Sequence, residues 1–135
     1  MSTDAIRFTA VTPNLIVRDI AASTRFYTEV LGFTINQTVP DAAPFVFVWL
    51  ERGDVRVFLN DPVAVAHDIP SYASPQFGGT AALFVTVDGV DALHATVAPH
   101  VPIVMSLRTQ FYGMREFAIH DPDGHLITFA ERVAG

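Results

Sequence analysis

The stretch AIHDPDGHLITFAE, residues 118–131, decides much of the fold because it places turn residues between two strand-like segments. Pro122 fixes the φ that the second position of a turn needs, and Asp121 can accept hydrogen bonds from the turn backbone. Gly124 tolerates a positive φ, which favours a type I turn continued into a glycine bulge. The stretch therefore predicts a β-hairpin in which residue 118 faces 128 and residue 116 faces 130.

The same turn is rich in groups that bind metal ions. Two histidines and two aspartates crowd into residues 120–125. A calcium loop needs more acidic ligands at alternating positions and a later glutamate, and the sequence continues HLITFAER instead. The residues favour a structural turn, and a metal-binding loop is the alternative.

Outward from this hairpin, the chain shows an internal repeat. Residues 14–33 (NLIVRDIAASTRFYTEVLGF) and 82–100 (ALFVTVDGVDALHATVAPH) each contain an apolar strand, an aspartate and a helical pattern. The aspartates, Asp19 and Asp88, stand 69 residues apart where strand gives way to helix. An aspartate there predicts an N-cap.

Three further apolar segments follow each helix, and turn residues separate them. The segments are FTINQTV, PFVFVWLE and DVRVFLND in the first half, and VPIVMSL, MREFAIH and HLITFAE in the second. The sequence thus predicts an α+β fold of two βαβββ modules in a single domain, residues 1–135. Module one spans about 8–60, a Pro- and Gly-rich linker or lid about 61–79, and module two about 80–132.

Composition excludes several classes of function. The absence of cysteine excludes disulfides, thiolate metal sites and cysteine nucleophiles. A net charge of −6 with only eight Lys and Arg argues against nucleic acid as a partner. No apolar run is long enough to span a bilayer, and the first ten residues lack a signal-peptide pattern. We therefore expect a cytoplasmic protein without membrane or nucleic-acid partners.

The segments LIVRDIAASTRFYTEVLGF and GMREFAIHDPDGHLITF, together with the repeat, resemble the vicinal oxygen chelate superfamily. This group contains glyoxalases, bleomycin-resistance proteins and ring-cleaving dioxygenases, and the resemblance covers about residues 10–131. It implies curled mixed sheets around a groove, usually in a homodimer that completes the site. The shared segments are specific for the superfamily but not for one activity.

The resemblance also implies where a metal would be held. In metal-dependent members, His and Glu ligands come from four strand positions, which match Thr12, Phe58, Ala82 and Thr128 here. The second position could shift by two residues to Asn60. None of these side chains is an imidazole or a carboxylate, the donors that divalent ions need. We therefore expect no metal and no other cofactor.

Strand alternation assigns a candidate binding face in module one. If a turn is centred on Arg52–Gly53, residues 47 and 58 are paired, as are 49 and 56. One face then carries aromatic rings with a few polar groups: Phe45, Phe47, Trp49, Arg56, Phe58 and Asn60. The opposite face is purely aliphatic and is expected to pack under helices: Val46, Val48, Leu50, Val55, Val57 and Leu59. An aromatic face with few polar groups suits a small-molecule site, although the rings could also fill a dimer interface.

In module two the predicted hairpin register places Glu116, Ala118 and His120 on the same face as Thr128. Glu116 and His120 are too far apart on a strand to chelate one ion together. A loop before this strand adds further candidate ligand contacts, namely Phe111, Tyr112 and Arg115, with surface turn residues as the alternative.

These features lead to one hypothesis with two alternatives. The first is a metal-free homodimer that binds and sequesters a bulky, partly aromatic small molecule, such as an antibiotic, without turnover. The second is a lyase, isomerase or dioxygenase that uses a metal and unusual ligands. The third is a dimeric interaction module whose groove is filled by side chains.

Overall fold

Two four-stranded mixed sheets with the same strand order form the framework of the computed structural model, which describes residues 6–72, 77 and 81–133. Sheet one has the order β1-β4-β3-β2, from β1 (Asn14–Ile16), β2 (Thr34–Val39), β3 (Phe47–Arg52) and β4 (Val55–Asn60). Sheet two has the order β5-β8-β7-β6, from β5 (Ala82–Thr86), β6 (Met105–Thr109), β7 (Met114–His120) and β8 (Leu126–Arg132). β1 pairs with β4 in parallel, as β5 does with β8, and all other neighbouring strands are antiparallel. The predicted α+β class and the two βαβββ modules are confirmed.

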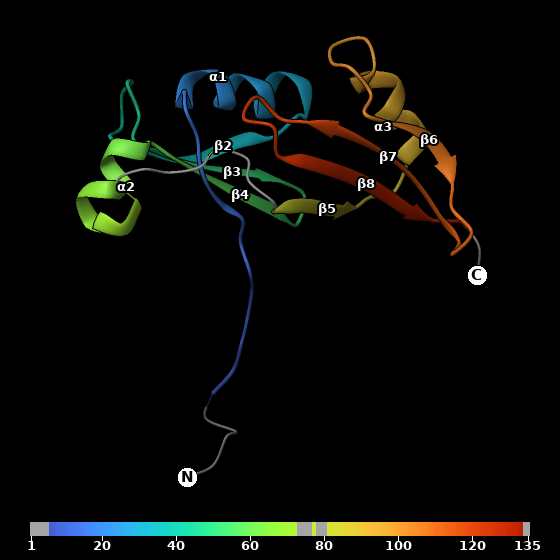
Figure 1. Cartoon of the computed structure of the whole chain (residues 1–135), viewed down its shortest axis with the longest axis horizontal. Helices are drawn as coiled ribbons and strands as arrows, with labels where there is room; N and C mark the ends of the chain where they lie inside the picture. The colour runs from blue at the N-terminus through green and yellow to red at the C-terminus, as the bar shows by residue number, and fades with distance from the viewer. Residues whose placement is uncertain (1–5, 73–76, 78–80, 134–135) are drawn as a thin grey trace.

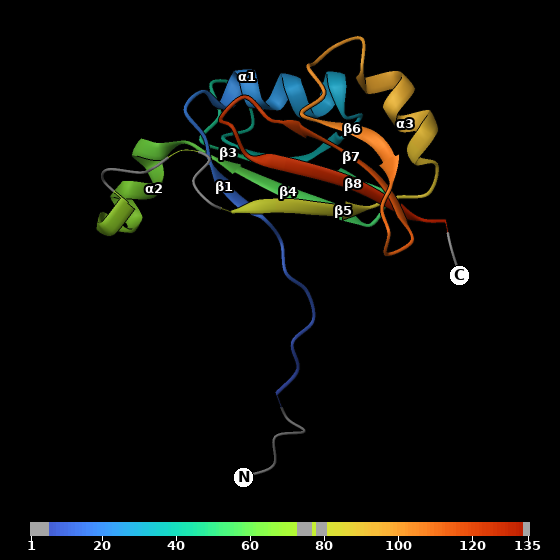
Figure 2. The same cartoon turned by 45° about the vertical axis from the view of Figure 1, so that its right-hand side comes forward.

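The helices of both modules lie on the same side of the sheets (Figures 1 and 2). Module one carries α1 (Ile20–Arg25), which continues into a π-helical turn, η2 (Phe26–Val30), and module two carries α3 (Val90–Val97). Below the helices, the start of β4 (Val55–Val57) and the edge strand β5 lie side by side and line one cavity, so the two sheets meet there (Figures 1 and 2). We call the sheet surfaces turned away from α1 and α3 the open faces.

The aliphatic sides of the strands pack under these helices. In sheet one the buried residues are Leu15, Val17, Val48, Leu50, Val57 and Leu59, and in sheet two they are Phe117, Ile119, Ile127 and Phe129. They alternate with residues on the open faces, as the two-residue period of a strand requires. The predicted aliphatic face is confirmed for residues 48–59, whereas Val46, before β3, is exposed.

The sequence predicted the register of one hairpin correctly and that of the other incorrectly. In β7–β8, Ala118 faces Thr128 and Glu116 faces Ala130, as Gly124 predicted. In β3–β4 the predicted pairs are wrong by two residues, because the turn is centred on Gly53–Asp54 and Trp49 therefore pairs with Phe58. A shift of two residues preserves the face of every side chain, so the face assignment survives.

One of the two predicted helix caps needs correction. Asp19 caps α1 by accepting from the amide of Ala22, but Asp88 does not cap α3, whose N-cap is Gly89. Instead, the carboxylate of Glu131 on β8 accepts hydrogen bonds from the amides of Gly89 and Val90.

The predicted linker contains α2 (Pro62–Asp68) and a 3-10 turn, η3 (Pro70–Tyr72). Helix α2 begins with Asp61 as its cap and Pro62 in its first turn, both common helix-start signals.

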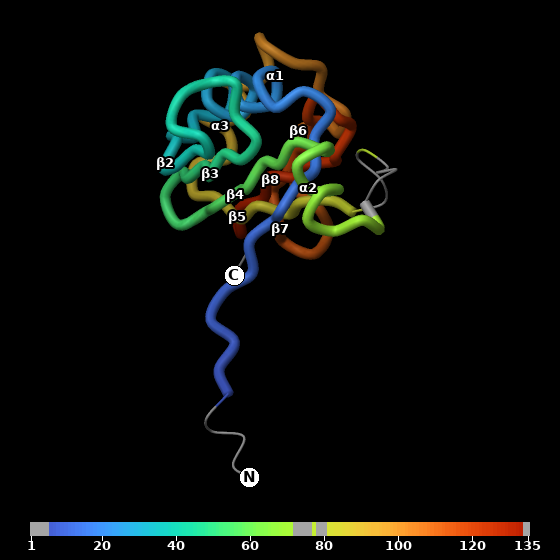
Figure 3. Tube along the Cα trace, turned by 90° about the vertical axis from the view of Figure 1, so that its left-hand side faces the viewer, coloured from blue at the N-terminus to red at the C-terminus, as the bar shows by residue number. Residues whose placement is uncertain are grey.

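The N-terminal segment, residues 6–13, runs away from the sheets on the side opposite α1 and α3 (Figure 3). Its apolar side chains have little contact with the rest of the chain: Phe8 is 98% exposed and Val11 is 95% exposed. Within the described residues, no helix has the length and apolar character needed to cross a membrane.

Candidate functional site

The open face of sheet one carries a row of three aromatic rings. Phe58 lies between Phe47 and Trp49, with ring centroids 5.2 Å and 5.6 Å away and tilted, edge-on geometry in both contacts. All three side chains remain partly exposed. The three adjoining rings, tilted against one another, form an apolar surface that an aromatic ligand can contact.

Polar groups mark one end of this aromatic row. Glu51 accepts a hydrogen bond from the indole nitrogen of Trp49 at 3.0 Å and lies 3.6 Å from the guanidinium of Arg56. The guanidinium of Arg56 in turn lies over the Trp49 ring, 5.8 Å from its centroid. These contacts hold the indole in one orientation. At the other end, Asn60 donates to Asn14 and to the carbonyl of Leu15.

Phe45 does not join this row. It precedes β3, and its partly buried side chain packs against the core under the helices. The strand alternation used to predict its face does not extend to residue 45, because β3 begins at Phe47.

The open face of sheet two has a different character. Its central residues are Glu116, Ala118, Thr128 and Ala130, and the glutamate and both alanines are buried. Towards β5, Phe84 pairs with Thr128 and is 60% exposed. This face therefore offers a buried carboxylate flanked by small side chains, with one exposed ring near the boundary between the sheets.

Arg115 lies on the opposite side of sheet two. Its guanidinium forms an ion pair with Asp91 of α3 at 3.0 Å, so the structure places it under the helix and not with the other candidate residues. Its neighbour Tyr112 does approach the open face and donates to Glu116 at 2.6 Å. Phe111, in the turn before β7, and His120, the last residue of β7, are exposed.

The four positions that the resemblance assigned to a metal carry Thr12, Phe58, Ala82 and Thr128. A hydroxyl, a phenyl ring and a methyl group are a poor donor set for a divalent ion. Among the described residues, no group of three or more His, Asp or Glu side chains could hold a metal ion. The residues present at the family's positions do not fit that metal.

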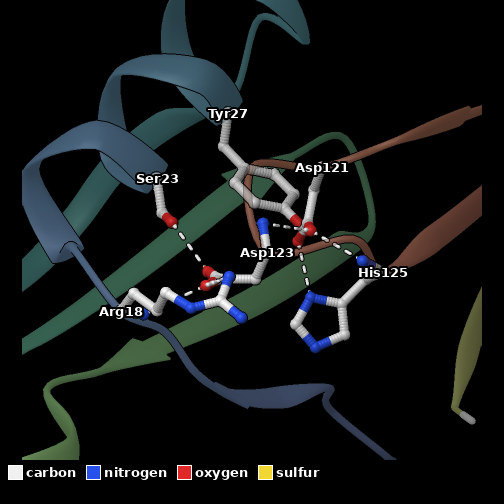
Figure 4. A network of polar contacts seen from close by, with 6 residues as sticks. All are labelled: Arg18, Ser23, Tyr27, Asp121, Asp123 and His125. Atoms are coloured by element: carbon white, nitrogen blue, oxygen red, sulfur yellow. Dashed lines mark hydrogen bonds and ion pairs between the residues drawn. The ribbon is translucent and has the colours of Figure 1, made fainter. Parts of the chain in front are cut away.

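In the turn at residues 121–124, the side chains of Asp121 and Asp123 are buried and face the helix of module one (Figure 4). Asp121 accepts hydrogen bonds from the Tyr27 hydroxyl at 2.9 Å and from the amides of Asp123 and His125, and its carboxylate lies 2.8 Å from the His125 ring. Gly124 has the predicted positive φ, 88°. The structural-turn interpretation holds, since these acidic groups bind protein donors.

Asp123 completes the connection between the two modules. One oxygen accepts from the amide of Arg18 at 3.1 Å and lies 3.4 Å from its guanidinium, and the other accepts from the Ser23 hydroxyl at 3.5 Å. The sequence did not reveal the contact between Tyr27 and Asp121. The signal was the hydroxyl itself, because a buried tyrosine usually needs a hydrogen-bond acceptor.

These contacts shift the ionisation of the turn. The hydrogen bond to Asp121 raises the pKa of His125 above its ordinary value despite the opposing effect of burial. Burial alone would raise the pKa of Asp121, but the hydrogen bonds from His125 and Tyr27 outweigh it and lower that pKa. Burial, followed by the charge of Asp121, raises the pKa of Tyr27 far above the ordinary value. At neutral pH the network is therefore built on an ionised Asp121 and a neutral Tyr27.

Two adjoining cavities run along the boundary between the modules, with volumes of about 500 and 530 Å³. Residues lining both include Leu31, Phe33, Val55, Val85 and Phe129. Neither cavity is lined by Phe47, Trp49 or Phe58. Within one chain, the aromatic row is thus an open surface and not the wall of either cavity.

Comparison with known proteins agrees with this architecture. Residues 7–129 match the model of the Glyoxalase/Bleomycin resistance protein/Dioxygenase superfamily. Over 131 residues, the chain is 31% identical to bleomycin resistance proteins from Geobacillus stearothermophilus and Staphylococcus aureus, covering 90% of this chain and 95% of each relative.

Solved structures show the same fold. A protein of unknown function from Agrobacterium tumefaciens superposes with a TM-score of 0.72 at 31% identity, covering 93% of this chain and 94% of that one. The bleomycin-binding protein of Streptomyces verticillus, solved with copper(II)-bleomycin, gives a TM-score of 0.64 at 22% identity and covers 96% and 98%. The matches span nearly the whole length of both partners, and the chain belongs to the Glyoxalase/Bleomycin resistance protein/Dioxygenase superfamily.

Proposed function

We propose that this protein binds and sequesters a bulky, partly aromatic small molecule without using a metal and without turnover. The observation that carries the proposal is the row of Phe47, Phe58 and Trp49, three adjoining rings left partly exposed on an open sheet face. Exposed aromatic surface of this kind is typical of a binding site, because a ligand that covers it removes apolar area from water.

The chemistry of the side chains supports binding over catalysis. The family's metal positions lack imidazole and carboxylate groups, so a metal-dependent lyase, isomerase or dioxygenase would need ligands elsewhere. The bleomycin resistance proteins at 31% identity suggest an antibiotic as the ligand. Bleomycin is therefore the first compound to test.

A homodimer is part of the proposal, because a single chain leaves the aromatic row uncovered. The N-terminal segment, which contains the exposed residues Phe8 and Val11, runs on the side of the molecule opposite the helices, as the open faces do (Figure 1). A second copy could cover both surfaces in an interface on the order of 2,000 Å². We expect a particle of about 29 kDa, twice the 14.7 kDa chain, by light scattering.

The remaining partners follow from charge and composition. With a net charge of −6, the protein suits a cationic ligand and does not suit nucleic acid. We propose a cytoplasmic protein whose partners are a small molecule and its own second copy.

The binding test uses Trp49, the single tryptophan of the chain, as a reporter. Metal-free bleomycin and copper-bleomycin are titrated separately, with fluorescence and calorimetry recorded together. We expect saturable quenching with matching heat. Phe58→Leu should weaken binding about tenfold, the scale of one lost aromatic contact. The matched control, Phe26→Leu, alters a ring on the helical side and should leave the affinity unchanged.

Two results would overturn parts of this proposal. Absence of heat and quenching with both forms of bleomycin would remove the antibiotic ligand, and absence of binding across a panel of aromatic compounds would favour an interaction module. A stoichiometric, tightly held metal in protein purified without chelators would favour the metalloenzyme.

A further inference from the structure

A buried carboxylate on the open face of sheet two has only half of its hydrogen-bonding capacity used. Glu116 is 4% exposed, and its Oε1 accepts from the Tyr112 hydroxyl at 2.6 Å and from the Gln110 amide at 3.3 Å. Its other oxygen, Oε2, is buried and has no hydrogen-bond partner in the described part of the chain. Buried polar groups are nearly always paired, so this oxygen needs a partner from elsewhere.

The position of Glu116 in β7 turns it away from the helix of its own module. Its neighbours Arg115 and Phe117 contact α3, through Asp91 and His94 respectively. Because side chains alternate along a strand, Glu116 lies on the open face. Its cross-strand partner is Ala130 and the next residue on its side of β7 is Ala118, so small methyl groups flank the carboxylate.

The turn before β7 surrounds the paired oxygen. Gly113, with a φ of 87°, closes a turn in which its amide donates to the Gln110 carbonyl at 3.0 Å. This geometry brings Gln110 and Tyr112 to the same oxygen. It also leaves the Phe111 ring 98% exposed and edge-on to Tyr112, at 5.1 Å between centroids. Both donors thus hold Oε1 and leave Oε2 unpaired.

We propose that Glu116 is a binding site for a positively charged nitrogen of the ligand, a protonated amine or a guanidinium. A buried carboxylate with an unpaired oxygen is costly to keep ionised, and a cation offering an N–H group removes that cost. The exposed ring of Phe111 and the half-exposed ring of Tyr112 add surfaces that attract cations. This inference rests on the proposed function, since it names the charge of the small molecule that the open faces bind.

The chain contains one internal competitor for this role. Arg108 on β6 is in register with Glu116 on β7, and its side chain is exposed. In the described part of the chain, Arg18, Arg56 and Arg115 form ion pairs with other carboxylates, whereas Arg108 forms none with Glu116. A rearrangement of Arg108 onto Oε2 would satisfy Glu116 without a ligand, so the experiment must distinguish the two.

The test compares two aromatic probes of the same shape, naphthylmethylammonium and neutral naphthalenemethanol, by calorimetry at neutral pH. Wild-type protein should bind the cation about tenfold or more tightly than the alcohol, the scale of one charge-assisted hydrogen bond. Glu116→Gln keeps the size of the side chain and should abolish this preference. The matched control, Glu29→Gln, removes an exposed charge on the helical side and should preserve it.

Each outcome separates the two proposals. If neither probe binds, the aromatic binding function fails. If both bind equally well and Glu116→Gln changes nothing, the function stands and the cation site is wrong. If the wild type shows no preference for the cation and Arg108→Ala creates one of about tenfold, Arg108 satisfies Glu116 in solution and the proposal is overturned. Without a ligand, Glu116→Gln should not lower the thermal midpoint, and a clear drop would indicate that Oε2 is already paired.

Discussion

The hairpins β3–β4 and β7–β8 occupy the same place in their sheets but differ in what their turns bind. The first turn, Gly53–Asp54, stays with its own module: the adjacent Arg52 donates to the carbonyl of Leu31 at 2.6 Å. The second turn, residues 121–124, contacts the helix of the other module, and we call it the crossing turn. The repeat thus provides two similar sheets, whereas the longer turn with two carboxylates joins them.

The helices show the same asymmetry. Tyr27 is the eighth residue counted from the start of α1, and Val97 is the eighth residue of α3. Both are fully buried, but only the tyrosine carries a hydroxyl for the crossing turn. The two modules share one topology, but their side chains differ in function. Module one contains the aromatic row and the helix that the turn contacts, and module two contains the turn and the buried Glu116.

Removing the centre of the crossing turn should have the largest effect. Asp121→Ala deprives the Tyr27 hydroxyl, the His125 ring and two amides of their acceptor. We expect the free energy of unfolding to fall by about 3–5 kcal/mol, as for other buried charged groups that lose a partner. Urea denaturation measures this change. Asp41→Ala, which removes an exposed aspartate, is the control and should stay within about 0.5 kcal/mol. A loss below about 1 kcal/mol for Asp121→Ala would mean that the turn does not stabilise the fold.

Deleting only the crossing hydroxyl should have a smaller effect. Tyr27→Phe keeps the ring and its edge-on contacts with Phe26 and Phe33. It leaves Asp121 with one donor fewer, which should cost about 1–3 kcal/mol in urea denaturation. Thr96→Val removes an exposed hydroxyl from α3 and should stay within about 0.5 kcal/mol. Equal losses of stability for the two variants would contradict the proposed difference between the two helices.

The protonation of His125 should make the junction sensitive to pH. Its pKa is raised in the folded protein, so its stabilising effect is fully present below the ordinary histidine pKa of about 6.5. The effect is lost as the pH rises through the raised value. Relative to His125→Gln, the wild-type protein should therefore lose about 1–2 kcal/mol of stability across that window, the scale of one charge-assisted hydrogen bond. Parallel stability curves for the two proteins would show that His125 does not titrate against Asp121.

Much of the fold could be predicted from periodicity and turn chemistry. Gly124 gave the correct register of β7–β8, because only one turn in DPDG uses its positive φ. For β3–β4, the sequence ERGD allowed turns centred one residue apart, and the prediction chose the wrong one. The faces were still correct because the resulting shift in pairing is two residues.

Long-range polar contacts could not be predicted in the same way. Tyr27 and Asp121 are 94 residues apart, and no local pattern specifies their meeting. Arg115 was predicted on the ligand side from its place in a loop, but it belongs to β7, where alternation turns it towards α3. The sequence also could not predict that Oε2 of Glu116 lacks a hydrogen-bond partner, because this depends on which donors the turn at 110–113 brings to Oε1.

The smallest expected effects concern the two helix caps. Asp19→Ala removes a local cap from α1 and should cost about 1 kcal/mol. Glu131→Gln should cost less, because the glutamine oxygen can still accept from the α3 amides and only the charge is lost. The hydrogen bonds from Val90 and Gly89 lower the pKa of Glu131, so its contribution is present above the ordinary glutamate pKa. The difference between wild type and Glu131→Gln should then vanish as the pH falls through the lowered value. Asp88→Asn should leave the thermal midpoint unchanged. A loss of stability equal to that of Glu131→Gln would instead show that Asp88 caps α3, as the repeat predicted.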